Sequence, residues 1–313
     1  MTWKLALGLS IAASAIAQNR LVTNVGNFIH DVGELDRSVH FYRDVLGMEM
    51  QRPPGDWQTT DGVLKMYDAV GGKFRVGNAQ IPGSPMRVEM VEFQGVDRKP
   101  ARRPWGMAGT SVLMLTAADL TPILERLKSA NVPELAKLKK ACDGRGVVVA
   151  DPDGFAVMPV ERGEQAAGSP PTKSNAASNF TGLRFGYLVS GDALAKGPFA
   201  ALGLTAETRT HTCRPIEDVL MNGAASIVTL PGGFEIWLAK GKAEKSEPAI
   251  HPRDPGAAVL RLMVSDVDAA VKALQQAQLV VASADGAIQT LPPAGLRAVI
   301  LRAPDDLFIQ VVK

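Results

Sequence analysis

Histidine and cysteine, the residues that most often bind metals or act as nucleophiles, are scarce in this sequence. The sequence contains four histidines and two cysteines, namely His30, His40, His211, His251, Cys142 and Cys213. It has no C-x-x-C pair, no G-x-S-x-G elbow and no phosphate loop. The glycines of "AVGGKFRVG" do not open a helix in the way that a dinucleotide site requires. No short motif therefore identifies a reaction.

The surroundings of each histidine favour structural roles. His30 follows Ile29 in an alternating stretch, so we expect it to face the helix side of a strand as a core or boundary residue. His40 lies among the exposed positions of a helix. His211 precedes Cys213 in "THTCRP", which is either a weak metal motif or, as we favour, a solvated loop. His251 in "AIHPRDP" is expected in a loop.

The pattern of apolar residues predicts a strand, a helix and two or three further strands near the N-terminus. "RLVTNVGNFIHDV" alternates by two, as a strand does. In "ELDRSVHFYRDVLGMEM", Leu35, Val39, Tyr42 and Leu46 form one apolar stripe of a helix that ends at Gly47. "KFRVGNAQI" and "MRVEMVEF" then read as strands separated by turn residues.

This arrangement returns three times. The second unit begins at "GTSVLMLTAADL", has a helix starting at Thr121-Pro122 and ends in "GRGVVVADPDGFAVMPVER", with "DPDG" as a turn. The third begins at "FTGLRFGYLV" and the fourth at "AAVLRLMVSDVDAAVKAL". "ADPDGFAVMPV" and "RAPDDLFIQVV" match in position and pattern. Internal repetition is therefore the strongest organising signal in the chain.

The stretches "VGELDRSVHFYRDVLGMEM", "MRVEMVEF" and "ADPDGFAVMPVE" resemble the vicinal oxygen chelate superfamily. That superfamily includes glyoxalase I, extradiol dioxygenases, fosfomycin-resistance proteins and bleomycin-binding proteins. The resemblance implies an α+β fold of four βαβββ modules, which form two tandem domains with cupped sheets. The expected boundaries are a first domain 22–162 with modules 22–100 and 108–162, a linker 163–179, and a second domain 180–313 with modules 180–242 and 256–313.

The resemblance also implies where up to four metal ligands per cup would lie, on the first and last strands of each module. For the first cup these positions are Asn27, Glu89, Ser111 and Met158. For the second cup they are Arg184, Glu235, Val259 and Gln310. Few of these residues are good ligands for a hard divalent ion, so no cofactor is expected, with a divalent metal as the alternative. Arg184 is expected to pair with Glu235 where the metal would have been.

Two classes of function remain open. The first is binding of a small molecule in a metal-poor cleft lined by these residues, as drug-sequestering members of the superfamily do. The alternative is a divergent metal-dependent lyase, isomerase or extradiol dioxygenase that uses Glu89 or Glu235 as its catalytic residue. A catalytic base would need a pKa raised by an apolar cleft. Otherwise Glu89 is simply a carboxylate hydrogen-bonded to Asn27 and Ser111. In a third interpretation, the second cup is only structural and supports the first.

Composition excludes some partners. The chain has 313 residues, a net charge of +2 and 46% apolar residues, which is typical of a globular protein. The nearly balanced charge and the low aromatic content argue against nucleic-acid binding. A small-molecule ligand and a monomer or homodimer are expected.

The N-terminal residues resemble a signal peptide. One lysine precedes the apolar "LALGLSIAASAIA", which ends in small residues before "QNR". We expect cleavage after Ala17, no membrane span thereafter, and a secreted or periplasmic protein. A buried first helix is the alternative for residues 1–17. In an oxidising compartment Cys142 and Cys213 would be free to form a disulfide, but two cysteines do not make a framework.

Overall fold

The computed structural model describes residues 20–80, 86–141, 144–162, 180–208, 214–242 and 249–313. The expected signal peptide 1–17, the linker 163–179, both cysteines and His211 lie outside the described residues. No helix in the described part is long and apolar enough to cross a membrane.

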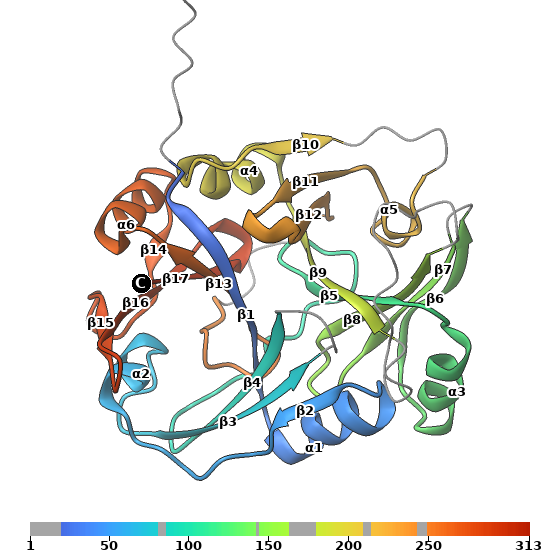
Figure 1. Ribbon diagram of the computed structural model, residues 1–313, viewed down its shortest axis with the longest axis horizontal. Coiled ribbons are helices and arrows are strands. Elements are labelled where there is room, and N and C mark those ends of the chain that lie inside the picture. Colours follow the sequence, from blue (N-terminus) through green and yellow to red (C-terminus); the bar gives the residue numbers. More distant parts are fainter. Residues whose placement is uncertain (1–19, 81–85, 142–143, 163–179, 209–213, 243–248) are drawn as a thin grey trace, which may run out of the picture.

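The strands form two curved mixed sheets that lie side by side (Figure 1). The order in the first sheet is β14 (Val280–Val281), β16 (Leu296–Arg302), β17 (Phe308–Val312), β13 (Ala258–Val264), β1 (Val22–Val32), β4 (Arg87–Gln94), β3 (Lys73–Gln80) and β2 (Glu49–Arg52), with β15 (Gln289–Leu291) beside β16. The order in the second sheet is β10 (Ala206–Thr208), β11 (Ala225–Thr229), β12 (Glu235–Lys240), β9 (Phe180–Val189), β5 (Ser111–Ala117), β8 (Ala156–Arg162), β7 (Gly144–Ala150) and β6 (Glu134–Ala141).

Each of the four repeats has a helix after its first strand. These helices are α1 (Leu35–His40, continued by a π-helical turn Phe41–Val45), α3 (Thr121–Ser129), α4 (Asp192–Ala201) and α6 (Val267–Gln276). Two short helices, α2 (Asp61–Met66) and α5 (Ile216–Leu220), are inserted into the first and third repeats, and single 3₁₀ turns occur at Pro231–Gly233 and Pro304–Asp306. The α+β architecture of βαβββ modules in two cupped sheets is confirmed.

The pairing of the modules differs from the expected one. The sequence groups the first module with the second, in one domain 22–162, and the third with the fourth. Instead β1 pairs antiparallel with β13, so that the first module shares a sheet with the fourth. Similarly β5 pairs with β9, so that the second module shares a sheet with the third. Alternation of apolar residues identifies strands but does not determine which of several similar edges meet.

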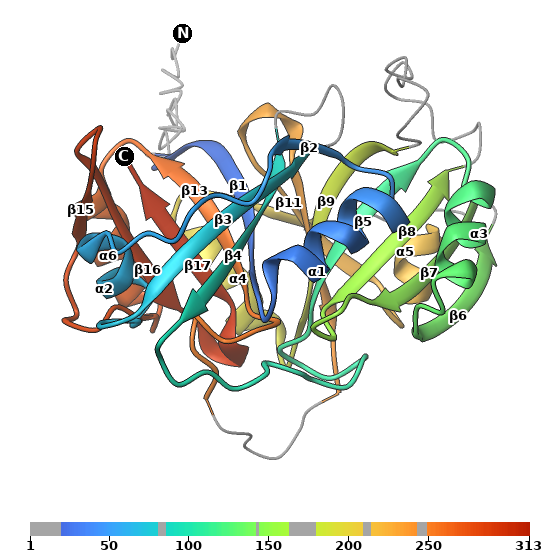
Figure 2. The ribbon, with the colours of Figure 1, turned by 90° about the horizontal axis from the view of Figure 1, so that it is seen from below.

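The helix α1 lies where its apolar stripe predicts. Leu35, Val39, Tyr42 and Leu46 are buried, and Gly47 follows with φ of 80°, a left-handed conformation that favours glycine. Figure 2 shows α1 crossing between the two sheets, whereas α3 lies at the outer edge of the second.

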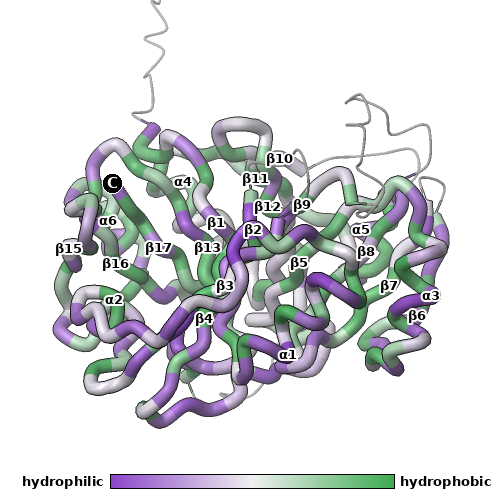
Figure 3. The backbone as a smooth tube through the Cα atoms, turned by 60° about the horizontal axis from the view of Figure 1, so that its bottom comes forward, coloured by the Kyte–Doolittle hydropathy of each residue, from purple (hydrophilic) through white to green (hydrophobic). Residues whose placement is uncertain are grey.

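The inserted helices fill the two cups. Leu64 and Met66 of α2 pack on Ile29, Val91 and other apolar residues of the concave face of the first sheet. Ile216 and Leu220 of α5 pack in the same way against the second sheet. Figure 3 shows hydrophobic segments along the strands of both sheets.

Candidate functional site

Four polar side chains meet on the concave face of the first sheet, and we call them the polar ring: Asn27, Glu89, Arg261 and Gln310. The amide of Asn27 donates a hydrogen bond to Glu89 Oε2 at 2.7 Å. Two guanidinium nitrogens of Arg261 donate to the two carboxylate oxygens of Glu89, at 2.9 and 3.1 Å. Its Nε donates to Gln310 Oε1 at 2.5 Å. The ring thus contains a bidentate ion pair flanked by two amides.

Strand register brings these residues together from distant parts of the chain. β1 runs parallel to β4, where Ile29 is opposite Glu89, and β13 runs parallel to β17, where Arg261 is opposite Gln310. Between these two pairs, β1 and β13 are antiparallel and their register shifts between Val25 and Phe28. This shift is a β-bulge, because Gly26 and Asn27 together lie opposite Arg261.

Gly26 leaves room for the arginine. A Cβ atom on Gly26 would lie 2.6 Å from both Cγ and Cδ of Arg261, closer than real side chains approach. Since the head group of Arg261 is held by Glu89 and Gln310, its stem has little freedom to move aside. A residue without a side chain at position 26 is therefore needed for Arg261 to reach the ring.

Apolar residues lie directly beneath the ring. Val259 is fully buried beside Ile29 and Phe308, so it belongs to the apolar floor of the cup and not to the ring. Val259 and Gln310 were expected in the second cup, but β13 and β17 belong to the first sheet. Gln310 therefore joins Asn27 and Glu89, and Arg261, two residues after Val259, is the residue of β13 that reaches the ring. The bulge and the choice of partner strand explain why Arg261 was missed.

The ring keeps Glu89 ionised. Burial opposes the charged form, but Arg261 and the hydrogen bonds outweigh it and hold the pKa of Glu89 below its ordinary value. The same partnership raises the pKa of Arg261 against the effect of burial. A general base needs a raised pKa to work near neutrality, so this arrangement argues against the catalytic role considered for Glu89.

The second sheet also carries an arginine, Arg184 on β9, in a position comparable to that of Arg261 on β13 of the first sheet. Arg184 NH1 lies 3.8 Å from Glu235 Oε2, as the sequence suggests, but 2.9 Å from Glu217 Oε1 on α5. Glu217 is fully buried and is also bound by Arg162 at 2.9 Å, while Trp237 Nε1 donates to Glu235. Glu217 was not predicted as a site residue, although an acidic residue between apolar neighbours in "PIEDVLM" was a usable signal.

The remaining positions of this second cluster are methionines. Met114 lies opposite both Arg184 and Met158 in the sheet. Ser111 was expected in the first cup with Asn27 and Glu89. It instead lies in the second sheet, opposite Tyr187 at the start of β5, and belongs to neither cluster. Met158 was expected beside Asn27 and Glu89, but the pairing of modules places it in the other sheet.

Comparison with known proteins agrees with this architecture. Residues 31–158 match the model of the Glyoxalase/Bleomycin resistance protein/Dioxygenase superfamily. These residues belong to that superfamily. No curated protein matches the chain. Glyoxalase I from Zea mays shares 15% identity over 93% of this chain and 92% of its own, with a TM-score of 0.61. A proposed dioxygenase from Bacillus subtilis shares 14% identity over 94% of this chain and 86% of its own, with a TM-score of 0.59. At 14–15% identity, these structures show only that the whole chain shares their fold.

Members of this superfamily usually bind a divalent metal, and the polar ring does not fit one. It offers one carboxylate and two neutral amides, and the fourth position is a guanidinium, which would repel a cation. The second cluster offers two thioethers and the carboxylates of Glu217 and Glu235, with Arg184 between the carboxylates and Arg162 also bound to Glu217. Neither set resembles the oxygen and imidazole ligands that a hard or borderline divalent ion prefers.

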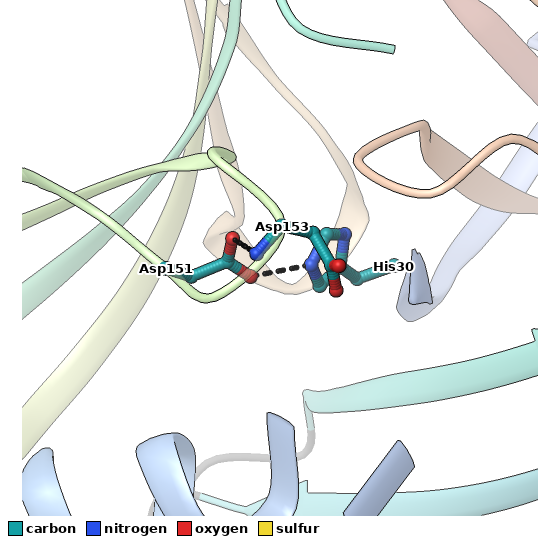
Figure 4. Close-up of side chains that lie close together, drawn as sticks. All are labelled: His30, Asp151 and Asp153. Atoms are coloured by element: carbon teal, nitrogen blue, oxygen red, sulfur yellow. Dashed lines mark hydrogen bonds and ion pairs between the residues drawn. The ribbon is translucent and has the colours of Figure 1, made fainter. Parts of the chain in front are cut away.

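A different cluster has the residue types of a metal site. His30, Asp151 and Asp153 are buried, and their ligand atoms lie within 4.8 Å of one another (Figure 4). His30 Nε2 is 2.6 Å from Asp151 Oδ2, and its Nδ1 is 3.3 Å from the carbonyl of Ala257. His30 faces away from the polar ring, as its alternation with Ile29 predicts.

The ligand atoms of this cluster already have partners. Asp151 Oδ1 accepts the backbone N–H groups of Asp153 and Phe155, both at 2.9 Å. Asp153 accepts hydrogen bonds from the backbone of Gly33 at 3.1 Å and from Arg37 at 3.1 Å. Since these donors point at the oxygens, an ion would have to displace them. The cluster fits a hydrogen-bonded junction between β1 of the first sheet and the "DPDG" turn of the second.

Proposed function

We propose that this protein is a metal-independent, small-molecule-binding member of the superfamily and that the polar ring is its binding site. The observation that carries the proposal is the bidentate pair of Arg261 with Glu89, at the place where strands of the first and fourth modules converge. A cation fixed there removes the need for a metal to attract an anionic group.

The ring is accessible and has unused hydrogen-bonding capacity. The side chains of Arg261 and Glu89 are 22% and 16% exposed. A guanidinium has five N–H groups, and the bonds to Glu89 and Gln310 use three of them. The two that remain, one on each terminal nitrogen, and the amide of Asn27 are available to the oxygens of a small anionic ligand.

Binding is favoured over catalysis because the only carboxylate of the ring is already committed. Arg261 holds the pKa of Glu89 low, which suits an ion-pair partner and not a base. In the second cluster Arg184 is similarly engaged by Glu217. An enzyme that uses Glu89 or Glu235 remains the alternative that the test addresses.

The test is a thermal-shift screen of the full chain with small carboxylates, phosphonates and enediols, followed by calorimetric titration of each hit. Arg261→Gln should weaken binding by at least about tenfold, the value of one charged hydrogen bond. The matched control is Arg297→Gln, because Arg297 forms an exposed pair with Asp268. A hit that keeps its affinity in R261Q, or turnover that E89Q or Glu235→Gln abolishes, would overturn the proposal.

We also propose export, on the evidence of the signal-like residues 1–17 alone. Expression of the full-length gene should yield mature protein that begins near Gln18 in the periplasm or the medium. N-terminal sequencing of the purified protein tests this. An uncleaved N-terminus in the cytoplasmic fraction would refute it.

A further inference from the structure

A cavity of about 230 Å³ opens at the β14 end of the first sheet, beside β16 and β17. Its walls come from the ends of these strands, from residues 280–284 and from residues 250–252. None of the four polar-ring residues lines it. It is smaller than the pockets that hold drug-sized molecules, which span about 300–1,000 Å³, so it suits a small ligand.

The cavity has a cationic end. Arg302 lines it and is 34% exposed, and its acidic neighbour Asp306 is 3.8 Å away. Asp306 is bound more closely by Arg103, at 2.5 Å. Arg302 is therefore a weakly paired cation, with a guanidinium available to a planar carboxylate.

The lining also contains a second polar group, formed by His251 and Asp68. His251 Nδ1 is 3.2 Å from Asp68 Oδ2, and both residues line the cavity. The same carboxylate oxygen is bound at 2.5 Å by Arg253. Since Arg253 already neutralises Asp68, Arg302 leaves the cavity with a net positive charge and His251 adds a hydrogen-bonding ring.

Apart from Ser283, the rest of the wall is apolar. Ile250 and Ala282 are partly buried and pack against the cluster that contains the fully buried Phe308. Val280, at the rim, is 51% exposed, one of the few large apolar side chains in the described part of the chain with such exposure. Val280 therefore extends the apolar part of the wall to the mouth of the cavity.

We propose that this cavity binds a small monocarboxylate with an apolar body. The carboxylate pairs with Arg302, and the hydrocarbon lies against Ile250 and Val280. A phosphate or another compact, fully hydrated anion would leave the apolar wall uncovered and binds less well. The site is independent of the polar ring, because neither Arg302 nor His251 contacts it.

The experiment is a calorimetric titration of the full chain with benzoate at constant ionic strength, with benzamide as its neutral isostere. Saturable one-to-one binding is expected, weakened at least about tenfold in Arg302→Gln and for benzamide. Arg297→Gln, on the same strand, should bind benzoate as the wild type does. Ala282→Leu, which fills the cavity without removing a charge, should also weaken binding.

Other outcomes would overturn the proposal. Absence of saturable benzoate binding, unchanged affinity in both R302Q and A282L, or equal affinity for benzamide and phosphate would each do so. If benzoate binding depends on Arg261 and not on Arg302, the cavity proposal fails while the polar ring gains support. The two sites are therefore tested separately.

Discussion

Arg261 and Glu89 face each other across the strands of the first sheet, partly buried and joined by two hydrogen bonds. Each makes the charge of the other tolerable, since an ion removed from water is costly unless it is paired. The Glu89 carboxylate is therefore ionised, but both of its oxygens are bound by Arg261. At the residue scale, this ion pair distinguishes the cup from a metal centre.

Replacing Arg261 by Gln should show that the ionised form of Glu89 depends on the arginine. Without the cation, burial dominates and the pKa of Glu89 rises, so the variant loses about 1–3 kcal/mol of unfolding free energy at neutral pH. In the wild type, the lowered pKa of Glu89 gives stability above the unfolded value of about 4.3 that is lost as the pH falls. Urea denaturation between pH 3 and 7 measures both. Equal pH profiles in the two proteins would contradict the account.

Asp31 is the opposite case. It faces the same cup and is fully buried, and neither of its carboxylate oxygens has a hydrogen-bond partner. Burial, assisted by the charge of Glu89, raises its pKa well above the ordinary value. Its raised pKa means that stability is lost as the pH rises above the unfolded value of about 3.9.

Asp31→Asn should therefore stabilise the protein at pH 7 by about 1–3 kcal/mol and have little effect near pH 3.5. Denaturation with urea at both pH values tests this. The exposed Asp61→Asn serves as the control and should change stability by less than about 0.5 kcal/mol at either pH. A destabilised D31N at pH 7 would contradict the prediction, because it would mean that the Asp31 carboxylate is ionised and stabilised by its surroundings.

At the scale of elements, the strands and helices followed from the sequence because their apolar periods are strong. The stripe of α1 and the alternation of β1 were predicted, and so was the outward face of His30. Arg261 was not, because one bulge at Gly26 and Asn27 shifts the register of β1 against β13. Glu217 was not, because α5 is an insertion that the repeated module does not contain. Irregular elements therefore determine the parts of the site that periodicity cannot predict.

The bulge makes a specific prediction for Gly26→Ala. A methyl group there would collide with the stem of Arg261, so binding at the polar ring should fall by at least about tenfold and stability by about 1–3 kcal/mol. Gly223→Ala is a matched control, because an added methyl group at that position meets nothing within 4 Å. Titration of a ring ligand and urea denaturation of both variants give the comparison. A G26A protein with wild-type affinity would contradict the prediction, because binding would then not require the observed position of the Arg261 side chain.

At the scale of the whole molecule, the two sheets are joined through His30 and Asp151, which come from different modules and different sheets. Burial alone would lower the pKa of His30, but the Asp151 carboxylate outweighs burial and raises it. The protonated junction is therefore the stabilising form. Its contribution is present below the unfolded pKa of about 6.5 and is lost as the pH rises through the folded value.

His30→Gln should remove this pH dependence. The variant should be less stable than the wild type by about 2–4 kcal/mol at pH 6, and the difference should shrink at higher pH. The exposed His40→Gln, which loses only a surface pair with Asp44, is the control. Denaturation curves from pH 6 to 9 measure the effect. A constant difference across that range would contradict a protonated junction.

The central claim is that the cup of the first sheet works without a metal. The most direct measurement is metal content by plasma mass spectrometry on the full chain purified without chelator, followed by titration with Zn²⁺ and Mn²⁺. E89Q and H30Q assign any bound ion to the ring or to the junction. We expect substoichiometric metal in the wild type and the same metal content in both variants. Near-stoichiometric metal that E89Q abolishes would contradict it.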